Sequence, residues 1–250
     1  MTKRRAAVKP DLLRFIENQL AESVADFSKT DVSNAINDDG AVVIAGLLMY
    51  DKSITTYLDL RDNSVGTAGV TAIVESLKTN HTLEDLDLSS NPFVTEENGL
   101  ETLLKALAEN TIHLTDLELD VCDLGKREFR MIADMLRTNT SLEIISLQHN
   151  NATFEDADAL EKAASERGVP ITIDLSHNEL TRGDFMRLNA QIIQVNKEGF
   201  LEEGDGYEGG DEGKCRSYPP LAIPGREARI SRGTALLRIA GVGPLVGVRK

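Results

Sequence analysis

Two histidines stand at a spacing that could hold a metal ion. His149 and His177 are 28 residues apart and occupy the same place in two copies of a short repeated pattern, so we expect them to lie near each other. A zinc site needs three or four ligands, and no third histidine or cysteine falls in this register. The sequence therefore predicts no metal site, and it shows no motif for a cofactor.

Nucleophilic and acid–base chemistry has little support in this chain. Cys122 stands where related positions carry asparagine, and no neighbouring residue suggests an activated thiol. The chain lacks a phosphate-binding glycine loop with Lys-Ser/Thr, a paired-histidine metalloprotease helix and a G-x-S-x-G serine elbow. Its acids are spread along the chain rather than gathered in one pocket. We therefore expect a protein that is not an enzyme.

A repeat determines which elements position these residues. The segment Leu83-Glu-Asp-Leu-Asp-Leu-Ser-Ser-Asn-Pro-Phe93 has the form L-x-x-L-x-L-x-x-N-x-L, and four other segments follow the same form. The residues at the asparagine position form what we call the asparagine column. They are Asn63, Asn91, Cys122, Asn150 and Asn178, separated by 28, 31, 28 and 28 residues. One repeat therefore carries a three-residue insertion, which we place around residues 93–98.

Between the strand-like segments, apolar residues change from alternating to helical spacing, as at Val70, Ile73, Val74 and Leu77. Each unit is thus predicted to be a short strand, an asparagine turn and a return helix, which is the crossover that parallel strands require. One unit cannot bury its apolar face alone, but stacked units can. We assign the asparagine column a structural role, because a side-chain amide can pair with backbone groups where each strand turns.

The predicted organisation has three parts. Residues 1–29 form an amino-terminal cap helix, with Pro10 in its first turn and a stripe of apolar residues extending to Phe27. Residues 30–198 form the repeat domain, closed by a helix over 184–197. Residues 199–250 are glycine-rich and acidic to 212, then basic from 213, and we expect them to be largely disordered.

The 28-residue period and the strings Lys78-Thr-Asn-His-Thr-Leu83 and Arg137-Thr-Asn-Thr-Ser-Leu142 resemble the ribonuclease-inhibitor-like class of leucine-rich repeats. The resemblance covers about residues 30 to 197. It implies an α/β right-handed solenoid shaped as a horseshoe arc, with parallel strands on the concave side and helices on the convex side. It also implies a scaffold for binding other proteins. The resemblance is specific for fold and weak for function.

Alternation along each strand places the leucines inward, so the residues between them face the concave side. The residues at these outward positions include eight acids and a single arginine. From them we select a candidate partner-binding set, called here the concave strip. It comprises Tyr57, Asp59, Arg61, Asp85, Asp87, Asp116, Glu118, Asp120, Ile144, Gln148, His149, Asp174 and His177.

Two interpretations of the acids in the concave strip remain open. They can accept lysine and arginine side chains of a protein partner, or they can keep an exposed sheet soluble. Tyr57 and Ile144 are the better anchor candidates, because an aromatic or apolar side chain on a polar face suits a binding hot spot.

Net charge and hydropathy limit which kind of partner this protein can bind and where in the cell it is expected. The formal net charge of −14 disfavours nucleic acid, whose phosphates it would repel, and favours a basic protein. No secretory signal or membrane-length apolar run is visible, so we expect a cytoplasmic protein without membrane binding.

Two alternative functions follow from weaker resemblances. The stretch from Ala106 to Leu147 is similar to the repeat domain of tropomodulins, which implies binding to the ends of actin filaments. The chain shows no counterpart of the tropomyosin-binding region that those proteins carry. Regulators of a small GTPase also combine this repeat class with an acidic tail, and an arginine finger would then have to be Arg61 or a loop residue such as Arg127.

Overall fold

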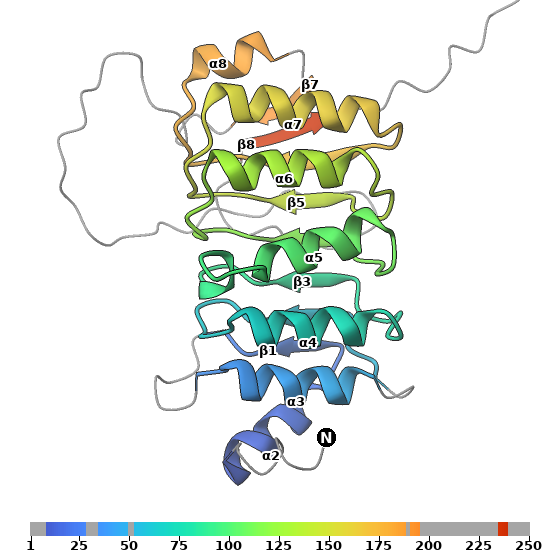
Figure 1. Cartoon of the computed structure of the whole chain (residues 1–250). Helices are drawn as coiled ribbons and strands as arrows, with labels where there is room; N and C mark the ends of the chain where they lie inside the picture. Colours follow the sequence, from blue (N-terminus) through green and yellow to red (C-terminus); the bar gives the residue numbers. More distant parts are fainter. Residues whose placement is uncertain (1–8, 29–34, 50–52, 189–190, 196–234, 240–250) are drawn as a thin grey trace, which may run out of the picture.

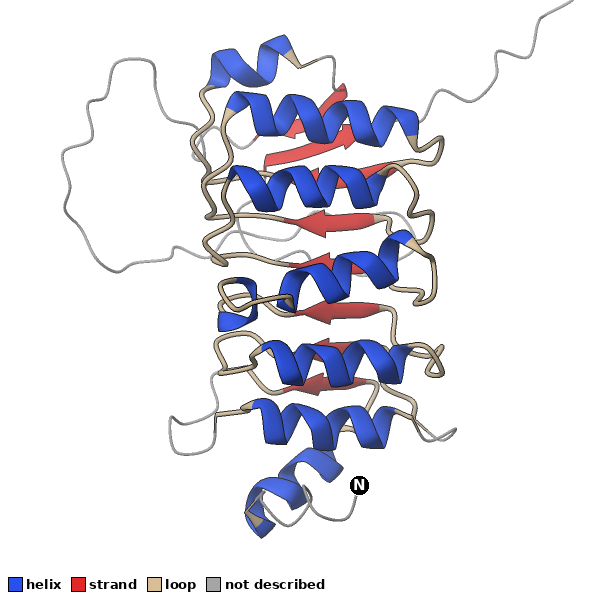
Figure 2. Ribbon diagram, viewed as in Figure 1, coloured by secondary structure: helices blue, strands red, loops and turns tan. Residues whose placement is uncertain are grey.

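The computed structural model describes residues 9–28, 35–49, 53–188, 191–195 and 235–239. Its strands lie side by side in one sheet, and the helices α3 to α7 cover one face of that sheet (Figure 1). Figure 2 shows that strands and helices alternate through the stack up to β6. None of the helices in the described part of the chain has the length and hydropathy needed to cross a membrane.

The repeat units appear as predicted, each with a three- or four-residue strand and a return helix. The units run through β2 (Tyr57–Asp59), α4 (Thr67–Leu77), β3 (Asp85–Asp87), η1 (Pro92–Val94), α5 (Gly99–Ala108), β4 (Asp116–Glu118), α6 (Lys126–Leu136), β5 (Ile144–Ser146), α7 (Phe154–Glu166) and β6 (Ile171–Asp174). An incomplete unit precedes them and contributes α3 (Asp38–Leu48). Neighbouring strands from β1 to β6 pair in parallel and without register shifts.

Register explains why the core forms continuous layers. The central strand residues lie opposite one another and are at most 1% exposed; they are Leu58, Leu86, Leu117, Ile145 and Ile173. A second layer contains Leu60, Leu88, Leu119, Leu147 and Leu175, again at most 1% exposed. Because every layer is shared between neighbouring units, the stability of the array rests on these contacts between repeats.

The amino-terminal end differs from the predicted cap. The helix α2 (Pro10–Gln19) ends well before Phe27, and Val24–Asp26 forms the strand β1, which pairs in parallel with β2. Ile16 and Phe27 are fully buried, and Phe15 packs edge-on against Phe27 with ring centroids 5.6 Å apart. Most of the apolar stripe thus packs into the core, but the prediction of a cap helix is wrong for its last part, which is strand and loop.

The carboxyl-terminal end also corrects the prediction. The expected closing helix over 184–197 is wrong in its second half, because α8 (Arg182–Arg187) stops early and Gln191–Val195 forms the strand β7. A segment of the expected disordered tail, Ala235–Ile239, forms the strand β8, which pairs antiparallel with both β6 and β7. The rest of the range 199–250 lies outside the described residues.

The insertion falls where the spacing placed it. The helix α5 begins eight residues after Asn91, whereas α4, α6 and α7 begin four residues after their own asparagine-column residue. The extra residues form η1 and a turn in which Asn98 has a φ of 65°. Gly99 then passes so close to η1 that a Cβ atom would lie 2.1 Å from the Phe93 carbonyl oxygen, so only glycine fits there.

Candidate functional site

The strands β2 to β6 place the concave strip on the face of the sheet opposite the helices, but they do not expose it evenly. His149 and His177 are exposed, and Tyr57, Arg61, Asp85, Asp116, Glu118, Asp120 and Ile144 are partly buried. Gln148 is buried, as are the carboxylates of Asp59, Asp87 and Asp174, whose residues are 3%, 0% and 2% exposed. We expected the whole concave strip to face a partner, but in the structure several of its side chains are buried.

Three of the buried acids share one backbone role. In each, the Oδ1 atom accepts a hydrogen bond from the amide two residues further along, which is the geometry of an Asx turn. The three pairs are Asp59 with the Arg61 amide at 3.0 Å, Asp87 with the Ser89 amide at 2.8 Å and Asp174 with the Ser176 amide at 3.0 Å. These aspartates thus shape the strand ends, a role that neither interpretation of the sequence assigned to them.

Arg61 joins the first two of these acids. Its Nη2 atom lies 2.6 Å from the Asp59 Oδ2 atom, and its Nε atom lies 3.4 Å from the Asp87 Oδ2 atom. Burial by itself would lower the pKa of Arg61, but the carboxylates of Asp87 and Asp59 raise it above its ordinary value, so Arg61 stays a cation. Asp59 and Asp87 lie opposite each other on neighbouring strands, and the repulsion between their carboxylates is relieved by the arginine of the strip itself.

Glu118 lies opposite Asp87 in the parallel register of β3 and β4. Burial, followed by the Asp87 charge, raises the pKa of Glu118 well above its ordinary value, so this side chain keeps its proton near neutral pH. A protonated Glu118 can donate a hydrogen bond to Asp87, whose Oδ2 atom otherwise has no hydrogen-bond partner. Burial and the same carboxylates also raise the pKa of Tyr57.

Asp120 ties β4 to the next turn. Its Oδ1 atom accepts hydrogen bonds from the Ser146 hydroxyl at 2.7 Å and the Gln148 amide at 2.8 Å. Burial raises the pKa of Asp120 to about 6, although these two hydrogen bonds act in the opposite direction. Gln148 in turn donates from its side-chain amide to Ser146 at 3.2 Å. Asp120 and Gln148 therefore belong to a structural network as much as to a docking face.

Asp174 uses only one of its two carboxylate oxygens as a hydrogen-bond acceptor. Its Oδ1 atom also accepts from the Ser176 hydroxyl at 2.6 Å, while its Oδ2 atom is buried and has no hydrogen-bond partner. Burial raises the pKa of Asp174 to about 7. A buried carboxylate oxygen without a donor is costly, and protonation of the carboxyl lowers that cost by removing its charge.

The asparagine column lies at the end of the strands, where each side chain links two repeats. Asn91, for example, accepts from the Val65 amide at 2.9 Å and donates to the Leu60 carbonyl at 2.8 Å. Asn63, Asn150 and Asn178 make equivalent bonds to the repeat before them. Each amide thus satisfies backbone groups that the solenoid buries.

Cys122 fills the same column without the same bonding. Its Sγ atom lies 3.4 Å from the Asp120 carbonyl oxygen and 3.9 Å from the Leu88 carbonyl oxygen, which are weak contacts for a thiol. Burial raises the pKa of Cys122 to about 12, so the thiolate needed for nucleophilic attack is scarce. This environment suits a packed core side chain.

The two histidines do come together, as their spacing predicted. The rings of His149 and His177 are stacked with centroids 4.2 Å apart and planes 5° from parallel. Although both residues are exposed, each ring covers one face of the other, and this partial desolvation lowers the pKa of both; the neighbouring His177 lowers that of His149 as well. Among the described residues, no group of three or more histidine, cysteine, aspartate or glutamate side chains could hold a metal ion.

Val121 marks a strained point on the rim of the strip. It occupies the position before the asparagine column, where Asp62, Ser90, His149 and His177 also have positive φ. A β-branched side chain is unfavourable there, and Val121 has a φ of 54° and is 54% exposed. Its amide donates to the Gln148 carbonyl at 3.0 Å, which holds the backbone in place.

We expect the substitution Val121→Asn to raise the free energy of unfolding by about 0.5–1 kcal/mol, because asparagine tolerates the left-handed conformation and little packing is lost. Urea denaturation of the two proteins measures this difference. Ile54→Asn is the matched control, since Ile54 is 56% exposed and has no positive φ. An equal gain in both variants would show that surface polarity, rather than backbone strain, is responsible.

Comparisons with known proteins agree with this architecture. A family profile described as "Leucine Rich repeat" matches residues 56–74 and 79–97. The chain is 26% identical to the ribonuclease inhibitor of Sus scrofa over 195 residues, which cover 77% of this chain and 42% of that protein. It is 27% identical to "NACHT, LRR and PYD domains-containing protein 4E" of Mus musculus over 169 residues, covering 67% of this chain and 17% of that protein.

Among solved structures, "Leiomodin-1 Actin-Binding Site 2 (ABS2)" matches with a TM-score of 0.48 and 19% identity, covering 63% of this chain and 87% of that chain. The chain spans less than half the length of the curated relatives it matches. The uniform parallel register, the asparagine column and the sequence matches lead to one assignment. The chain has the fold of a leucine-rich-repeat solenoid, and its sequence is similar to that of ribonuclease inhibitors.

Proposed function

We propose that this protein is a non-enzymatic interaction module that docks a basic protein partner on its concave strip. Stacked repeats of this kind present an extended concave sheet, and such surfaces serve as binding faces. The observation that carries the proposal is the excess of acids over bases on that sheet, where Arg61 is the single basic residue among the acids of the strip. Arg61 is already held by Asp59 and Asp87.

The strip offers different groups to such a partner along its length. Asp85 and Asp116 lie opposite each other in the β3–β4 register and are only partly buried, although the Oδ1 atom of Asp116 is itself buried. Tyr57 and Ile144, at the equivalent positions of β2 and β5, add apolar area on either side of them. Lysine or arginine side chains flanked by apolar groups would complement this arrangement.

The test compares variants that remove charge from the strip without removing an Asx turn. The double variant Asp85→Asn/Asp116→Asn keeps side chains of the same size, whereas changes at Asp87 would also disturb the Ser89 amide. The matched control is Glu75→Gln/Glu109→Gln, because these exposed acids lie on the helix-bearing side and belong to surface ion pairs. The full chain serves as bait, and any captured partner is then purified and titrated at several salt concentrations.

We expect the strip variant to bind about tenfold more weakly at low salt and the difference to shrink as salt rises, since exposed charges are screened. The control variant should bind as the unaltered chain does. Equal affinity of all three proteins at every ionic strength would overturn the proposal. Actin binding and regulation of a small GTPase stay predictions, which co-sedimentation with actin filaments and stimulated GTP hydrolysis test directly.

A further inference from the structure

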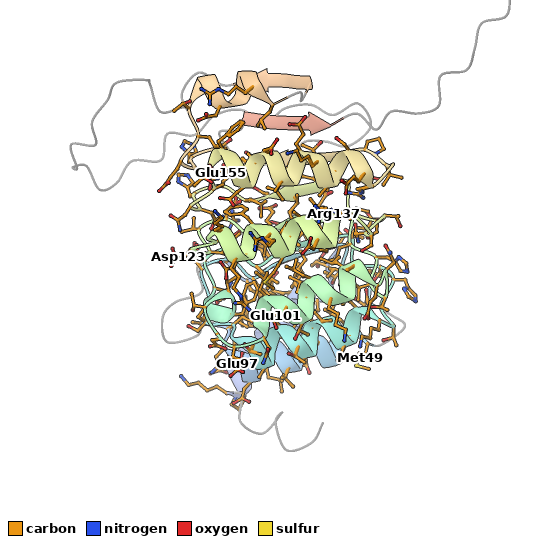
Figure 3. All side chains as sticks on the ribbon, turned by 45° about the horizontal axis from the view of Figure 1, so that its top comes forward. Met49, Glu97, Glu101, Asp123, Arg137 and Glu155 are labelled. Atoms are coloured by element: carbon orange, nitrogen blue, oxygen red, sulfur yellow. The ribbon has the colours of Figure 1, made fainter. Side chains whose placement is uncertain are left out.

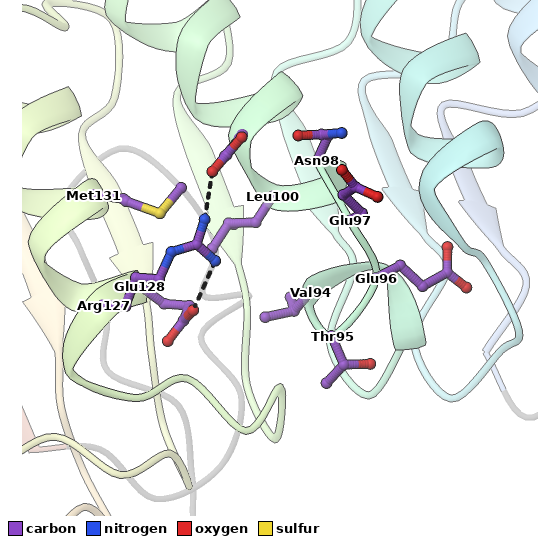
Figure 4. Close-up of a pocket in the computed structure, with 10 residues that line it drawn as sticks. Val94, Thr95, Glu96, Glu97, Asn98, Leu100, Arg127, Glu128 and Met131 are labelled. Carbon is purple, nitrogen blue, oxygen red and sulfur yellow. Dashed lines mark hydrogen bonds and ion pairs between the residues drawn. The ribbon is translucent and has the colours of Figure 1, made fainter.

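The insertion in the repeat that contains Asn91 creates a pocket away from the concave strip. The pocket has a volume of about 470 Å³ and lies between the inserted turn and the start of the next helix, α6 (Figure 4). Val94, Leu100 and Met131 supply apolar lining, and the charged lining residues are Glu96, Glu97, Glu101, Arg127 and Glu128. We call this site the insertion pocket. Its volume lies within the range of sites that hold a small ligand or a few side chains.

The inserted turn is fixed in place by the repeat before it. The Glu96 carboxylate accepts a hydrogen bond from the Thr67 amide at 2.6 Å, at the start of α4. The Thr67 hydroxyl donates to the Glu97 carbonyl at 3.2 Å, and the close approach of Gly99 to Phe93 fixes the end of the turn. The wall of the pocket is therefore held by contacts on both sides, which lowers the entropic cost of binding.

The charges that line the pocket favour a cation. Arg127 already bridges the two acids of neighbouring helices, with its Nη2 atom 2.5 Å from the Glu101 Oε1 atom and its Nη1 atom 3.6 Å from the Glu128 Oε1 atom. Glu97 is exposed, and its carboxylate has no hydrogen bond or ion pair with any described residue. Figure 3 labels both Glu97, in the inserted turn, and Glu101, which belongs to α5. The lining thus has four acids and one base.

From the pocket, its apolar lining and this charge we infer that the insertion pocket binds a short segment of a protein partner in which an arginine or lysine neighbours an apolar residue. The apolar side chain rests on Val94 and Met131, because Leu100 below them is only 3% exposed, and the thioether of methionine adapts to different shapes. The cationic side chain lies with its carbon stem on the same lining and its head group toward Glu97. This site is separate from the concave strip and does not depend on it.

The test uses a defined probe, the dipeptide acetyl-Leu-Arg-amide, titrated into the full chain. Binding is followed by the chemical shift of the Met131 methyl group in the NMR spectrum. That signal is identified by its absence in the variant Met131→Leu. The neutral dipeptide acetyl-Leu-Gln-amide is the control ligand. We expect the Met131 signal to shift with the arginine dipeptide, and to shift less with the neutral one, at millimolar concentrations.

Two charge variants are expected to change the affinity in opposite directions. Glu97→Gln removes a carboxylate from the lining and should weaken binding of the arginine dipeptide about two- to fivefold. Arg127→Gln removes the resident cation and leaves Glu101 and Glu128 to the ligand, so it should strengthen binding by a similar factor. The exposed acid Glu143, outside the pocket lining, provides the matched control Glu143→Gln, which should have no effect.

Two results would overturn the inference. One is the absence of any Met131 shift with the arginine dipeptide. The other is weaker binding in Arg127→Gln, which would mean that Arg127 attracts an anionic or polar group instead. The strip variant Asp85→Asn/Asp116→Asn should bind the dipeptide normally, so failure of this site and failure of the proposed concave docking are distinguishable.

Discussion

Replacing Asn150 by alanine is expected to lower the free energy of unfolding by about 3–5 kcal/mol. Asn150 is 6% exposed and makes bonds to two repeats. Its Oδ1 atom accepts from the Cys122 and Leu124 amides, each at 3.0 Å. Its Nδ2 atom donates to the Leu119 and Leu147 carbonyls, also at 3.0 Å. Alanine would leave these buried groups unpaired, and each unpaired amide costs about 1–3 kcal/mol.

Cys122→Ala provides the matched control for this prediction, because Cys122 occupies the same column but makes only weak contacts through sulfur. Its expected cost is about 1 kcal/mol, mostly from lost packing. Urea denaturation followed by circular dichroism measures both variants. If the two substitutions cost the same, the column would contribute through side-chain volume alone, and the hydrogen-bonding role of Asn150 would be refuted.

The difference between these two positions also shows what the sequence could predict. The period of the leucines and the asparagine column determined the units, their parallel order and the place of the insertion, because every unit must present the same residues to its neighbours. The ends of the array lack such a constraint. There the apolar stripe before Phe27 predicted only a helix, although part of it pairs as β1 with the sheet.

The roles of the acids were harder to predict for a different reason. Alternation correctly placed Asp59, Asp87 and Asp174 on the concave side, but their burial depends on how neighbouring strands pack. The spacing of an aspartate two residues before a turn amide is a local signal of an Asx turn, and it was present in the sequence. The bridging position of Arg61 depends on the register of β2 against β3, which no single repeat reveals.

The insertion pocket illustrates a third case. The irregular spacing of 31 residues indicated extra chain, but the sequence did not reveal that Glu96 caps α4 of the preceding repeat. That contact spans two repeats, and so do the contacts between Arg127 and Glu101. Features shared by all units could thus be predicted from the pattern. Features that depend on one departure from the pattern required the structure.

Raised carboxyl pKa values in the concave strip are expected to make the protein more stable at pH 5 than at pH 8. Burial and the Asp87 charge raise the pKa of Glu118. Burial raises the pKa of Asp120 to about 6 and that of Asp174 to about 7. In the unfolded chain these groups release their protons near pH 4. Between that pH and the raised value, the folded state therefore holds more protons than the unfolded state, and stability falls as pH rises.

The expected fall in the free energy of unfolding from pH 5 to pH 8 is about 2–4 kcal/mol. The histidines act in the opposite direction, because partial desolvation lowers the pKa values of His149 and His177 and the folded state resists their protonation. Their contribution is lost as pH falls below about 6.5. We therefore expect a stability maximum on the mildly acidic side of neutrality, set by the balance of these two groups of residues.

The variant Glu118→Gln measures how much of this pH dependence of stability is due to Glu118, which we expect to contribute the largest part. Glutamine can donate to the Asp87 carboxylate as protonated Glu118 does, but it cannot ionise. At pH 8 we expect it to raise the free energy of unfolding by about 1–3 kcal/mol, and at pH 5 to change it little. Urea denaturation at constant ionic strength from pH 5 to pH 8 measures both effects, with Glu143→Gln as the exposed control. A pH dependence unchanged by Glu118→Gln would mean that Glu118 is ionised in the folded protein, and Arg61 would then have to balance three carboxylates rather than two.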